Sequence, residues 1–209
     1  MLDEFSGSPT VDLQRAEELL GRALATSPRS SWPHYVRGQL LRAQGRCQDA
    51  IPEYEAAIAI DRNSAPSYAW LGWCKLLSGE IERVIPLEEQ AMRLSPQDRA
   101  IAGWYGRIGM ALLLQRRYDE AIIWLEKSRS RYAADGRAPT YVHSWLASAY
   151  AQKGDEAAAR TELKTAMALG LHPSIGALAA DPWYQNPKFR ALAEATYFVG
   201  LRKAGMRPE

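Results

Sequence analysis

The sequence predicts an all-helical, right-handed superhelical solenoid, and three columns of small residues that recur at one near-constant interval predict it. The first column is Gly38, Gly72, Gly109 and Ala147, separated by 34, 37 and 38 residues. Two further columns keep the same intervals: Ala50, Val84, Ala121 and Ala159, then Ala57, Ala91, Ser128 and Ala166. A period near 34 with small residues at fixed offsets is typical of stacked helix–turn–helix repeats.

The first full unit spans residues 31–64 and reads as two helices. The first is expected over roughly His34–Gln44, and Gly45 behind it is a residue that commonly ends helices. The second is expected over roughly Asp49–Ile60, with Asp49 as a plausible N-cap.

The second unit, residues 65–98, repeats this plan, with Gly79 in the turn and Pro96 closing the second helix. Pro86 stands at the offset that Pro52 has in the first unit. Both prolines are expected in the first turn of a second helix, where a missing N–H costs little. Prolines at these positions argue against strands.

Two more full units are expected at residues 102–135 and 140–173. In the third unit Arg116 replaces the turn glycine, and the fourth turns at Gly154. Upstream, residues 13–30 match only the second half of a unit. We therefore expect the array to begin with a half-repeat, which suggests either a piece cut from a longer protein or the loss of an N-terminal cap.

The two ends leave the pattern. Residues 1–12 are expected to be disordered or loosely ordered, and residues 174–209 to form a bridge and a cap. The bridge is the turn-rich segment 181–187. Apolar residues at helical spacing over Phe189–Lys203 predict a final amphipathic helix. Such a helix would cover the open face of the last repeat, which a solenoid must shield.

Composition limits the classes of function. The chain has 209 residues, 47% of them apolar, and its net charge is only +2. Lys and Arg are scattered, which argues against nucleic acid as a partner. No apolar run reaches the length of a membrane helix, and the acidic start lacks the features of a signal peptide. Cys47 and Cys74 are too few for a disulfide framework, so we expect reduced thiols in a cytoplasmic protein.

The columns resemble the tetratricopeptide repeat, whose motif is W-x2-L-G-x2-Y, then A-x3-F, then P. The third unit carries Tyr105, Ile108, Gly109, Leu112, Tyr118, Ala121 and Leu125 at these places. The resemblance covers residues 13–173. Arg37, Lys75 and Glu88 depart from it, where leucine, an aromatic residue and a large apolar residue are usual. We expect looser packing at these three positions.

A narrower resemblance concerns the segments 104–109, 117–128 and 200–205. They are similar to the C-terminal repeat regions of bacterial class III adenylate cyclases and related signalling or transcriptional regulators. This resemblance implies a non-catalytic regulatory module that docks a partner and passes the signal to an upstream domain. The alternative is a free-standing scaffold or assembly adaptor. An enzyme is a remote alternative.

No catalytic, cofactor-binding or metal site is expected. The glycines of segment 103–109 lack the spacing of a phosphate-binding loop, and no strand precedes them. His34 and His143 occupy the same aromatic slot of two different units, so each is expected to pack locally. His172 stands in a loop, and no cluster of His, Cys and carboxylates has metal-ligand spacing. The sequence therefore predicts no cofactor.

Family geometry implies that the first helix of each unit lines a concave groove that binds a protein or peptide segment. The expected groove residues are Trp32, Tyr35, Gln39, Arg42, Trp73, Leu76, Met110, Leu113 and Tyr141. The Lys and Asn set that clamps chaperone carboxylates is absent, because Tyr35, Gln39 and Trp70 stand at its first three places. An apolar trough of this kind suits an amphipathic helix of a partner. The alternative is that it is already filled by the chain's own C-terminal helix, or by a second copy in a homodimer.

Overall fold

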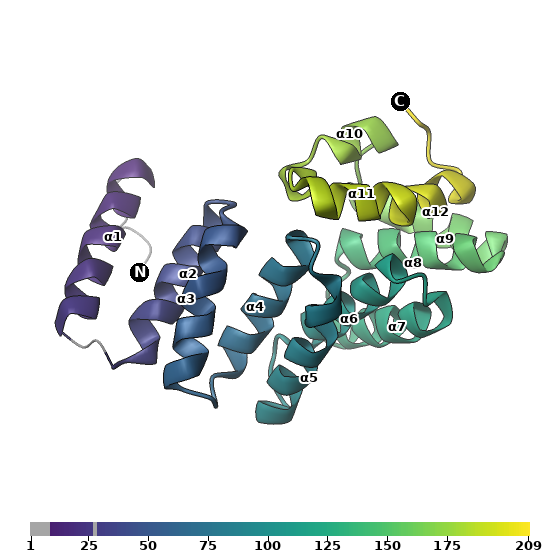
Figure 1. Ribbon diagram of the computed structural model, residues 1–209. Coiled ribbons are helices and arrows are strands. Elements are labelled where there is room, and N and C mark those ends of the chain that lie inside the picture. The colour runs from purple at the N-terminus through teal and green to yellow at the C-terminus, as the bar shows by residue number, and fades with distance from the viewer. Residues whose placement is uncertain (1–8, 27–28) are drawn as a thin grey trace.

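The computed structural model describes residues 9–26 and 29–209, which are helical along almost their whole length (Figure 1). The repeat array consists of α1 (Pro9–Thr26), α2 (Ser31–Ala43), α3 (Cys47–Ile60), α4 (Ala65–Leu77), α5 (Val84–Leu94), α6 (Ile101–Leu114), α7 (Tyr118–Ala134), α8 (Thr140–Lys153) and α9 (Glu156–Ala168). A single-turn helix, η1 (Ile81–Arg83), precedes α5. Within these described ranges the only β-type pairing is an isolated bridge between Ser174 and Arg207. The predicted fold class is confirmed.

The helices of the array pack in sequential pairs, α2 with α3, α4 with α5, α6 with α7 and α8 with α9. Helix α1 stands alone beside α2 at the N-terminal end (Figure 1). Of the segment 1–12, residues 1–8 lie outside the described residues. From Pro9 onward the segment is helical, so the expectation of disorder is wrong there. Proline suits the first helical position because its N–H would have no partner there anyway.

The turns inside the helix pairs lie at the expected residues. Gly45, Gly79 and Gly154 have φ values of +76°, +77° and +86°, in the left-handed region that glycine enters without steric cost. Arg116 takes the same place in the third unit with φ +63°. A side chain in that region costs about 1–2 kcal/mol, so the third unit pays for a turn that glycine would make freely.

The starts of the second helices differ from the prediction. Helix α3 begins at Cys47, so Asp49 lies in its first turn rather than at the N-cap, where it pairs with Arg46 at 2.8 Å. Pro52 consequently lies inside the helix, one turn later than expected. In the second unit η1 forms part of the connection between α4 and α5. Pro86 is the third residue of α5, in its first turn as expected.

The small-residue columns mark close helix crossings. A Cβ at Gly38 would lie 2.7 Å from the Tyr54 ring, and one at Gly109 would lie 2.5 Å from Cγ of Leu125. All eight residues of the other two columns are fully buried. Only small side chains allow the paired backbones to approach this closely, which is why the columns predict the fold.

The three departures from the repeat motif are paired charges rather than loose packing. Glu88 is fully buried and holds Arg107 in a two-point ion pair, with atom separations of 2.5 and 3.0 Å. Lys75 is buried with its ammonium 3.0 Å from Glu80. Arg37 is half exposed. The expectation of looser packing is therefore wrong for Glu88 and Lys75, because buried charges that are paired need no extra space.

Two histidines make the same contact in different units. His34 Nδ1 lies 2.8 Å from Glu53, and His143 Nδ1 lies 2.7 Å from Glu162. Each pair joins the two helices of one unit across 19 residues. In the third unit this slot holds an aromatic pair, Tyr105 and Trp124, with ring centroids 5.6 Å apart. Local packing of both histidines, as expected, therefore takes the form of a hydrogen bond to a glutamate.

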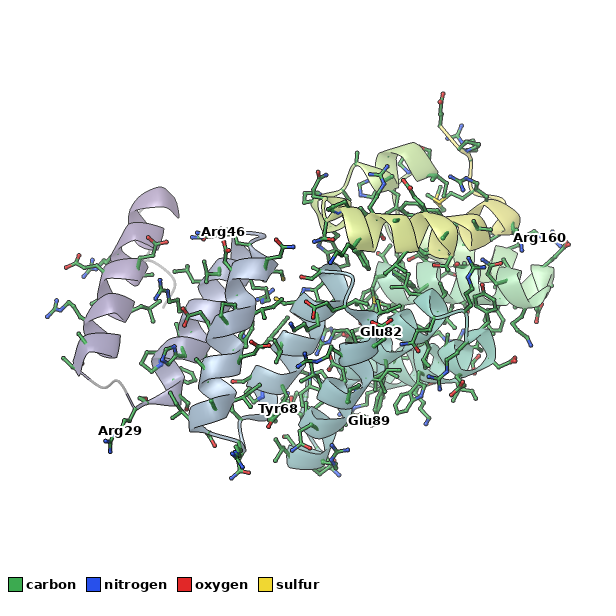
Figure 2. The ribbon with its side chains drawn as sticks, in the orientation of Figure 1. Arg29, Arg46, Tyr68, Glu82, Glu89 and Arg160 are labelled. Atoms are coloured by element: carbon green, nitrogen blue, oxygen red, sulfur yellow. The ribbon has the colours of Figure 1, made fainter. Side chains whose placement is uncertain are left out.

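A C-terminal layer covers the second half of the array. It consists of α10 (Ile175–Ala179), η2 (Pro182–Tyr184), α11 (Pro187–Ala195) and α12 (Tyr197–Ala204). The single helix expected over Phe189–Lys203 is two helices, broken at Thr196, whose φ and ψ are −136° and −72°. Figure 2 shows side chains filling the space between this layer and the array beneath it.

Helix α12 is the main contact of this layer, and it lies along α8. The rings of Trp145 and Tyr197 stack with centroids 4.0 Å apart. Ser148 donates a hydrogen bond of 2.9 Å to the Tyr197 carbonyl, and the Tyr197 hydroxyl donates one of 2.8 Å to Ser144. The contact therefore buries apolar rings and also pairs its buried polar groups. The layer is part of the folded core.

Candidate functional site

The C-terminal layer fills much of the groove that the sequence predicts. Leu76, Met110 and Leu113 are fully buried, in one cluster with Phe189 and Phe198 of the layer. The expectation that these three residues line an open groove is wrong. For this stretch the alternative holds, that the chain's own C-terminal segment occupies the trough. A continuous apolar surface of this length is unfavourable in water, and burying it stabilises the protein.

An open cavity of about 330 Å³ remains where the covered half of the array meets the uncovered half. Six helices of the array (α2, α3, α4, α6, α7 and α8) and the η2 segment of the layer contribute to its wall. We call it the Trp183 groove, and it is lined by Arg42, Gly45, Cys47, Trp70, Trp73, Leu77, Gly103, Arg107, Tyr132, Tyr141, Pro182 and Trp183.

Five of the twelve residues that line this groove are aromatic. Trp73 of α4 and Trp183 of η2 meet edge to face, with centroids 5.0 Å apart and planes at 78°. On the opposite side Tyr132 and Tyr141 also meet edge to face, at 6.4 Å. Trp183 is 43% exposed. Large, partly exposed aromatic side chains in a concave site are typical anchors for a protein partner.

The charge of the groove is positive. The Arg42 guanidinium lies 3.9 Å from the centroid of the Trp70 ring, and the Arg107 guanidinium lies 5.5 Å from it. Arg107 is neutralised by Glu88 behind it. Within the described part of the chain, no carboxylate lies within ion-pair distance of Arg42, whose Nε donates to Gln39 instead. Arg42 is therefore the cation of the groove that is available to a ligand.

The expected groove residues of the first unit form a connected line along α2. Trp32 is 66% exposed, and its ring lies 5.4 Å from that of Tyr35. Gln39 donates a hydrogen bond of 2.7 Å to the Tyr35 hydroxyl and accepts one of 3.0 Å from Arg42. The line leads to the Trp183 groove, although only Arg42 of these four residues lines it.

Of the nine expected residues, three therefore line the groove: Arg42, Trp73 and Tyr141. Sequence reasoning missed Arg107 and Trp183 as site residues. The signal at Trp183 is a tryptophan in a turn-rich bridge, but no periodicity relates that bridge to the array. Arg107 is recognisable only together with Glu88, as a charge in a helix that is otherwise apolar.

Two further hollows adjoin the groove. One, of about 390 Å³, shares Cys47, Leu77 and Trp183 with it, and the other, of about 210 Å³, shares Tyr141 and Trp183. Trp183 thus borders all three spaces. An extended segment can run past this indole from the α2–α3 turn towards α8.

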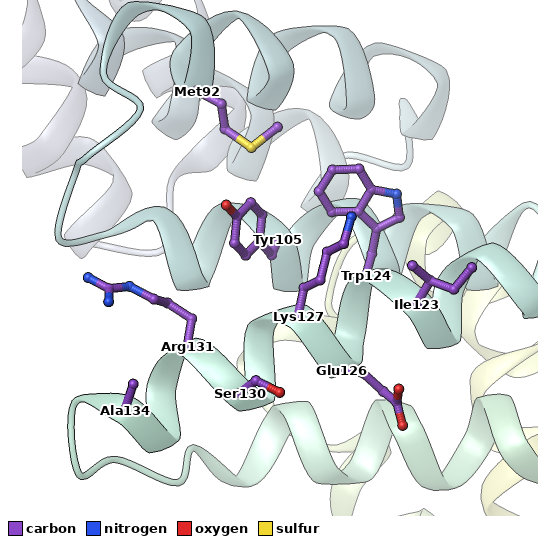
Figure 3. Close-up of a pocket in the computed structure, with 9 residues that line it drawn as sticks. All are labelled: Met92, Tyr105, Ile123, Trp124, Glu126, Lys127, Ser130, Arg131 and Ala134. Atoms are coloured by element: carbon purple, nitrogen blue, oxygen red, sulfur yellow. The ribbon is translucent and has the colours of Figure 1, made fainter.

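A separate hollow of about 850 Å³ lies on the outer side of α5, α6 and α7 (Figure 3). Its floor contains Met92, Tyr105 and Trp124. The Lys127 ammonium lies 4.4 Å from the Trp124 centroid and covers that ring. Because a cation already shields its largest aromatic surface, this hollow is a weaker candidate than the Trp183 groove.

Burial changes the acid–base properties of two residues near the groove. It raises the pKa of Glu88 to about 7, although the Arg107 guanidinium opposes this rise. It also raises the pKa of Tyr141, so the Tyr141 hydroxyl stays protonated. Across residues 9–26 and 29–209, no three His, Cys, Asp or Glu side chains gather as metal ligands would. None of the helices in these ranges is long and apolar enough to cross a membrane.

Comparison with known proteins bears on the fold. A family model described as tetratricopeptide repeat matches residues 12–66 and 35–99, and a second with the same description matches residues 103–131. No curated protein sequence gives a significant match.

Several solved structures are similar in fold. The crystal structure of MamA is 22% identical, with a TM-score of 0.64 over 76% of this chain and 89% of that one. YrrB is 17% identical, with a TM-score of 0.58 over 88% and 90% of the two chains. PilF of Pseudomonas aeruginosa is 17% identical, with a TM-score of 0.67 over 93% and 81%.

Proposed function

We propose that this chain, which is built from tetratricopeptide repeats, is a non-catalytic protein-interaction module that binds a peptide segment of a partner in the Trp183 groove. The observation that carries this proposal is an aromatic cavity with one cation, Arg42, that has no acidic partner in the described residues. A site with this composition is suited to an apolar or aromatic anchor residue beside a carboxylate.

The shape of the groove sets the size of the ligand. A space of about 330 Å³ is at the small end of ligand sites and holds a few side chains rather than a long helix. One adjoining hollow extends it at the α2–α3 turn, and the other extends it at α8. We therefore expect a short extended segment with an aromatic residue against Trp73 and Trp183 and an acidic residue at Arg42.

The similar structures are compatible with this function. The solved structure of YrrB is described as that of a repeat protein with an unusual peptide-binding site. At 17% identity this likeness concerns the fold only, so the ligand of the present chain is argued from its own residues.

The finer readings of the sequence stay predictions. They are a regulatory role beside a bacterial adenylate cyclase or transcriptional regulator, a free-standing scaffold, a homodimer and a cytoplasmic location. The groove supports the binding role in each of these settings. The length of the native gene around this segment separates the first two, and measurement of the oligomeric state tests the third.

The experiment that tests the proposal is selection of binders from a library of random peptides displayed on phage, followed by calorimetry. We expect enrichment of peptides that carry an aromatic and an acidic residue. Their affinity should fall about tenfold or more for Arg42→Ala and for Trp183→Ala, which corresponds to about 1.4 kcal/mol. Arg42→Lys should recover part of the loss, because it keeps the charge.

The matched control is Trp124→Ala, which removes an indole from the outer hollow. It should leave the affinity unchanged. Peptides that bind Trp183→Ala as tightly as the native protein, or that lose affinity only with Trp124→Ala, would place the binding surface elsewhere.

A further inference from the structure

Two thiols from adjacent units meet beside the Trp183 groove. Cys47 is the first residue of α3, and Cys74 lies in the last turn of α4. Packing of α3 against α4 brings both into one small buried cluster with Ala50, Tyr54 and Leu71. Neither thiol is part of a disulfide. These are the only two cysteines of the chain.

The surroundings of Cys47 favour its thiolate. The neighbouring Cys74 thiol lowers the pKa of the Cys47 thiol, burial opposes this effect, and the positive charge of Arg42 adds to it. Cys47 also stands at a helix N-terminus, where backbone N–H groups stabilise negative charge. The neighbouring Cys47 and burial raise the pKa of the Cys74 thiol.

Access to the two sulfurs is unequal. Cys47 is 8% exposed and lines both the Trp183 groove and the adjoining hollow of about 390 Å³. Cys74 is fully buried and lines neither of them. A small reagent in the groove therefore meets Cys47 first, with Cys74 directly behind it.

We infer that Cys47 and Cys74 are a modification site, a dithiol that a peroxide converts to a reversible intramolecular disulfide. The Cys47 thiolate attacks one oxygen of hydrogen peroxide, the O–O bond breaks, and the departing hydroxide takes up a proton to become water. Cys47 is then a sulfenic acid. The Cys74 sulfur attacks the Cys47 sulfur, the S–O bond breaks, and the hydroxyl leaves as water with the Cys74 proton.

The overall reaction consumes two thiols and one peroxide and yields one disulfide and two waters. A dithiol reductant reverses it by exchange. An S–S bond of about 2.05 Å forms when the two sulfurs are brought into direct contact. Trp73 precedes Cys74 in α4, so the reaction draws together two segments of the groove wall.

The test is mass spectrometry of the native full chain treated with hydrogen peroxide and then digested with trypsin. Cleavage after Arg46, Arg62 and Lys75 places the two cysteines in separate peptides, residues 47–62 and 63–75. We expect one cross-linked species of these two peptides, lighter by two hydrogen atoms than their sum, which disappears after treatment with dithiothreitol. Circular dichroism before digestion verifies that the protein is folded.

Two variants separate the roles. In Cys74→Ser, Cys47 should still react and should be trapped as a sulfenic acid by dimedone. In Cys47→Ser, the remaining thiol should react more slowly, on the order of tenfold, because it lacks thiolate character and access. Folded native protein that keeps both free thiols in excess peroxide, or that forms only disulfides between chains, would overturn the inference. None of these readouts depends on a peptide ligand, so they stand apart from the proposed function.

Discussion

Gly200 of α12 packs so tightly on Ser148 of α8 that a Cβ at position 200 would lie 2.1 Å from the Ser148 Oγ and 2.5 Å from its carbonyl oxygen. This crossing holds the C-terminal layer on the array. It occurs where Ser148 donates its hydrogen bond to the Tyr197 carbonyl, so neither backbone can move away without breaking that bond. The closure of the predicted groove depends on this contact between two helices.

Gly200→Ala should therefore destabilise the protein by about 2 kcal/mol or more, because overpacking at a backbone contact forces α12 away from α8. Partial release of the layer would expose Met110 and Leu113. The measurement is chemical denaturation together with binding of a fluorescent hydrophobic dye. Gly205→Ala is not a suitable control, because its φ of +106° disfavours alanine. Gly176→Ala serves better, since its nearest neighbour in space would be 3.4 Å from the new Cβ.

Gly72→Leu should destabilise the array by about 3 kcal/mol or more. A Cβ there would lie 2.7 Å from the Glu88 carboxylate, which has no room to move because it is fully buried. The larger side chain would break the Glu88–Arg107 pair, and loss of a buried pair costs about 3–5 kcal/mol. Gly21→Ala is the control, with no atom within 4 Å of the added Cβ. An unchanged urea midpoint for Gly72→Leu would contradict the crossing.

Replacing Glu88 alone should lower the free energy of unfolding more than replacing Glu88 and Arg107 together. Glu88→Leu alone leaves the buried Arg107 without a counter-ion and should cost about 3–5 kcal/mol. The double variant Glu88→Leu with Arg107→Met replaces both charges by apolar groups and should recover most of this loss. A double-mutant cycle of unfolding free energies measures the difference. If the loss in the double variant equals the sum of the two single losses, Glu88 and Arg107 do not interact energetically, and this prediction is wrong.

The contribution of Glu88 to the free energy of unfolding should fall as pH rises towards neutrality. Its folded-state pKa is raised to about 7 from an ordinary value of 4.5, chiefly by burial. Between these values the folded state binds more protons than the unfolded state, so the free energy of unfolding decreases with increasing pH. The contribution is fully present below about pH 4.5 and is lost as pH passes about 7.

Comparison of the native protein with Glu88→Gln isolates the pH-dependent contribution of Glu88 to stability, because glutamine does not titrate. Both proteins are denatured with urea at several pH values between about 5 and 8. The difference in unfolding free energy, native minus variant, should decline across this range. A difference that stays constant, or that increases with pH, would show that Glu88 is ionised throughout.

Trp73→Ala should weaken binding of a selected peptide by roughly 2 kcal/mol, within the range of interface anchor residues. Its ring also meets Trp183 edge to face, so we expect a loss of stability of about 1–2 kcal/mol. Calorimetry and denaturation on the same sample measure both quantities. Lost stability with unchanged affinity would make Trp73 a core residue only, and a shift from dimer to monomer would assign the groove to self-association.

The sequence by itself determined the repeat array. Gly38, Gly72 and Gly109 predict helix crossings because a close approach excludes larger side chains, and such contacts join residues within one unit. Gly45, Gly79 and Gly154 predict turns because the left-handed backbone conformation favours glycine whatever surrounds it. Both signals are local, so a single sequence carries them.

Only the tertiary structure decided what the array leaves open. The C-terminal layer covers Met110 and Leu113 through contacts such as that of Ser148 with Tyr197, which are 49 residues apart. The same is true of Trp183 against Trp73. No periodic pattern encodes these pairings, because they depend on how one segment packs across several units at once. The array could therefore be predicted from spacing, whereas the Trp183 groove was visible only after the layer had been placed.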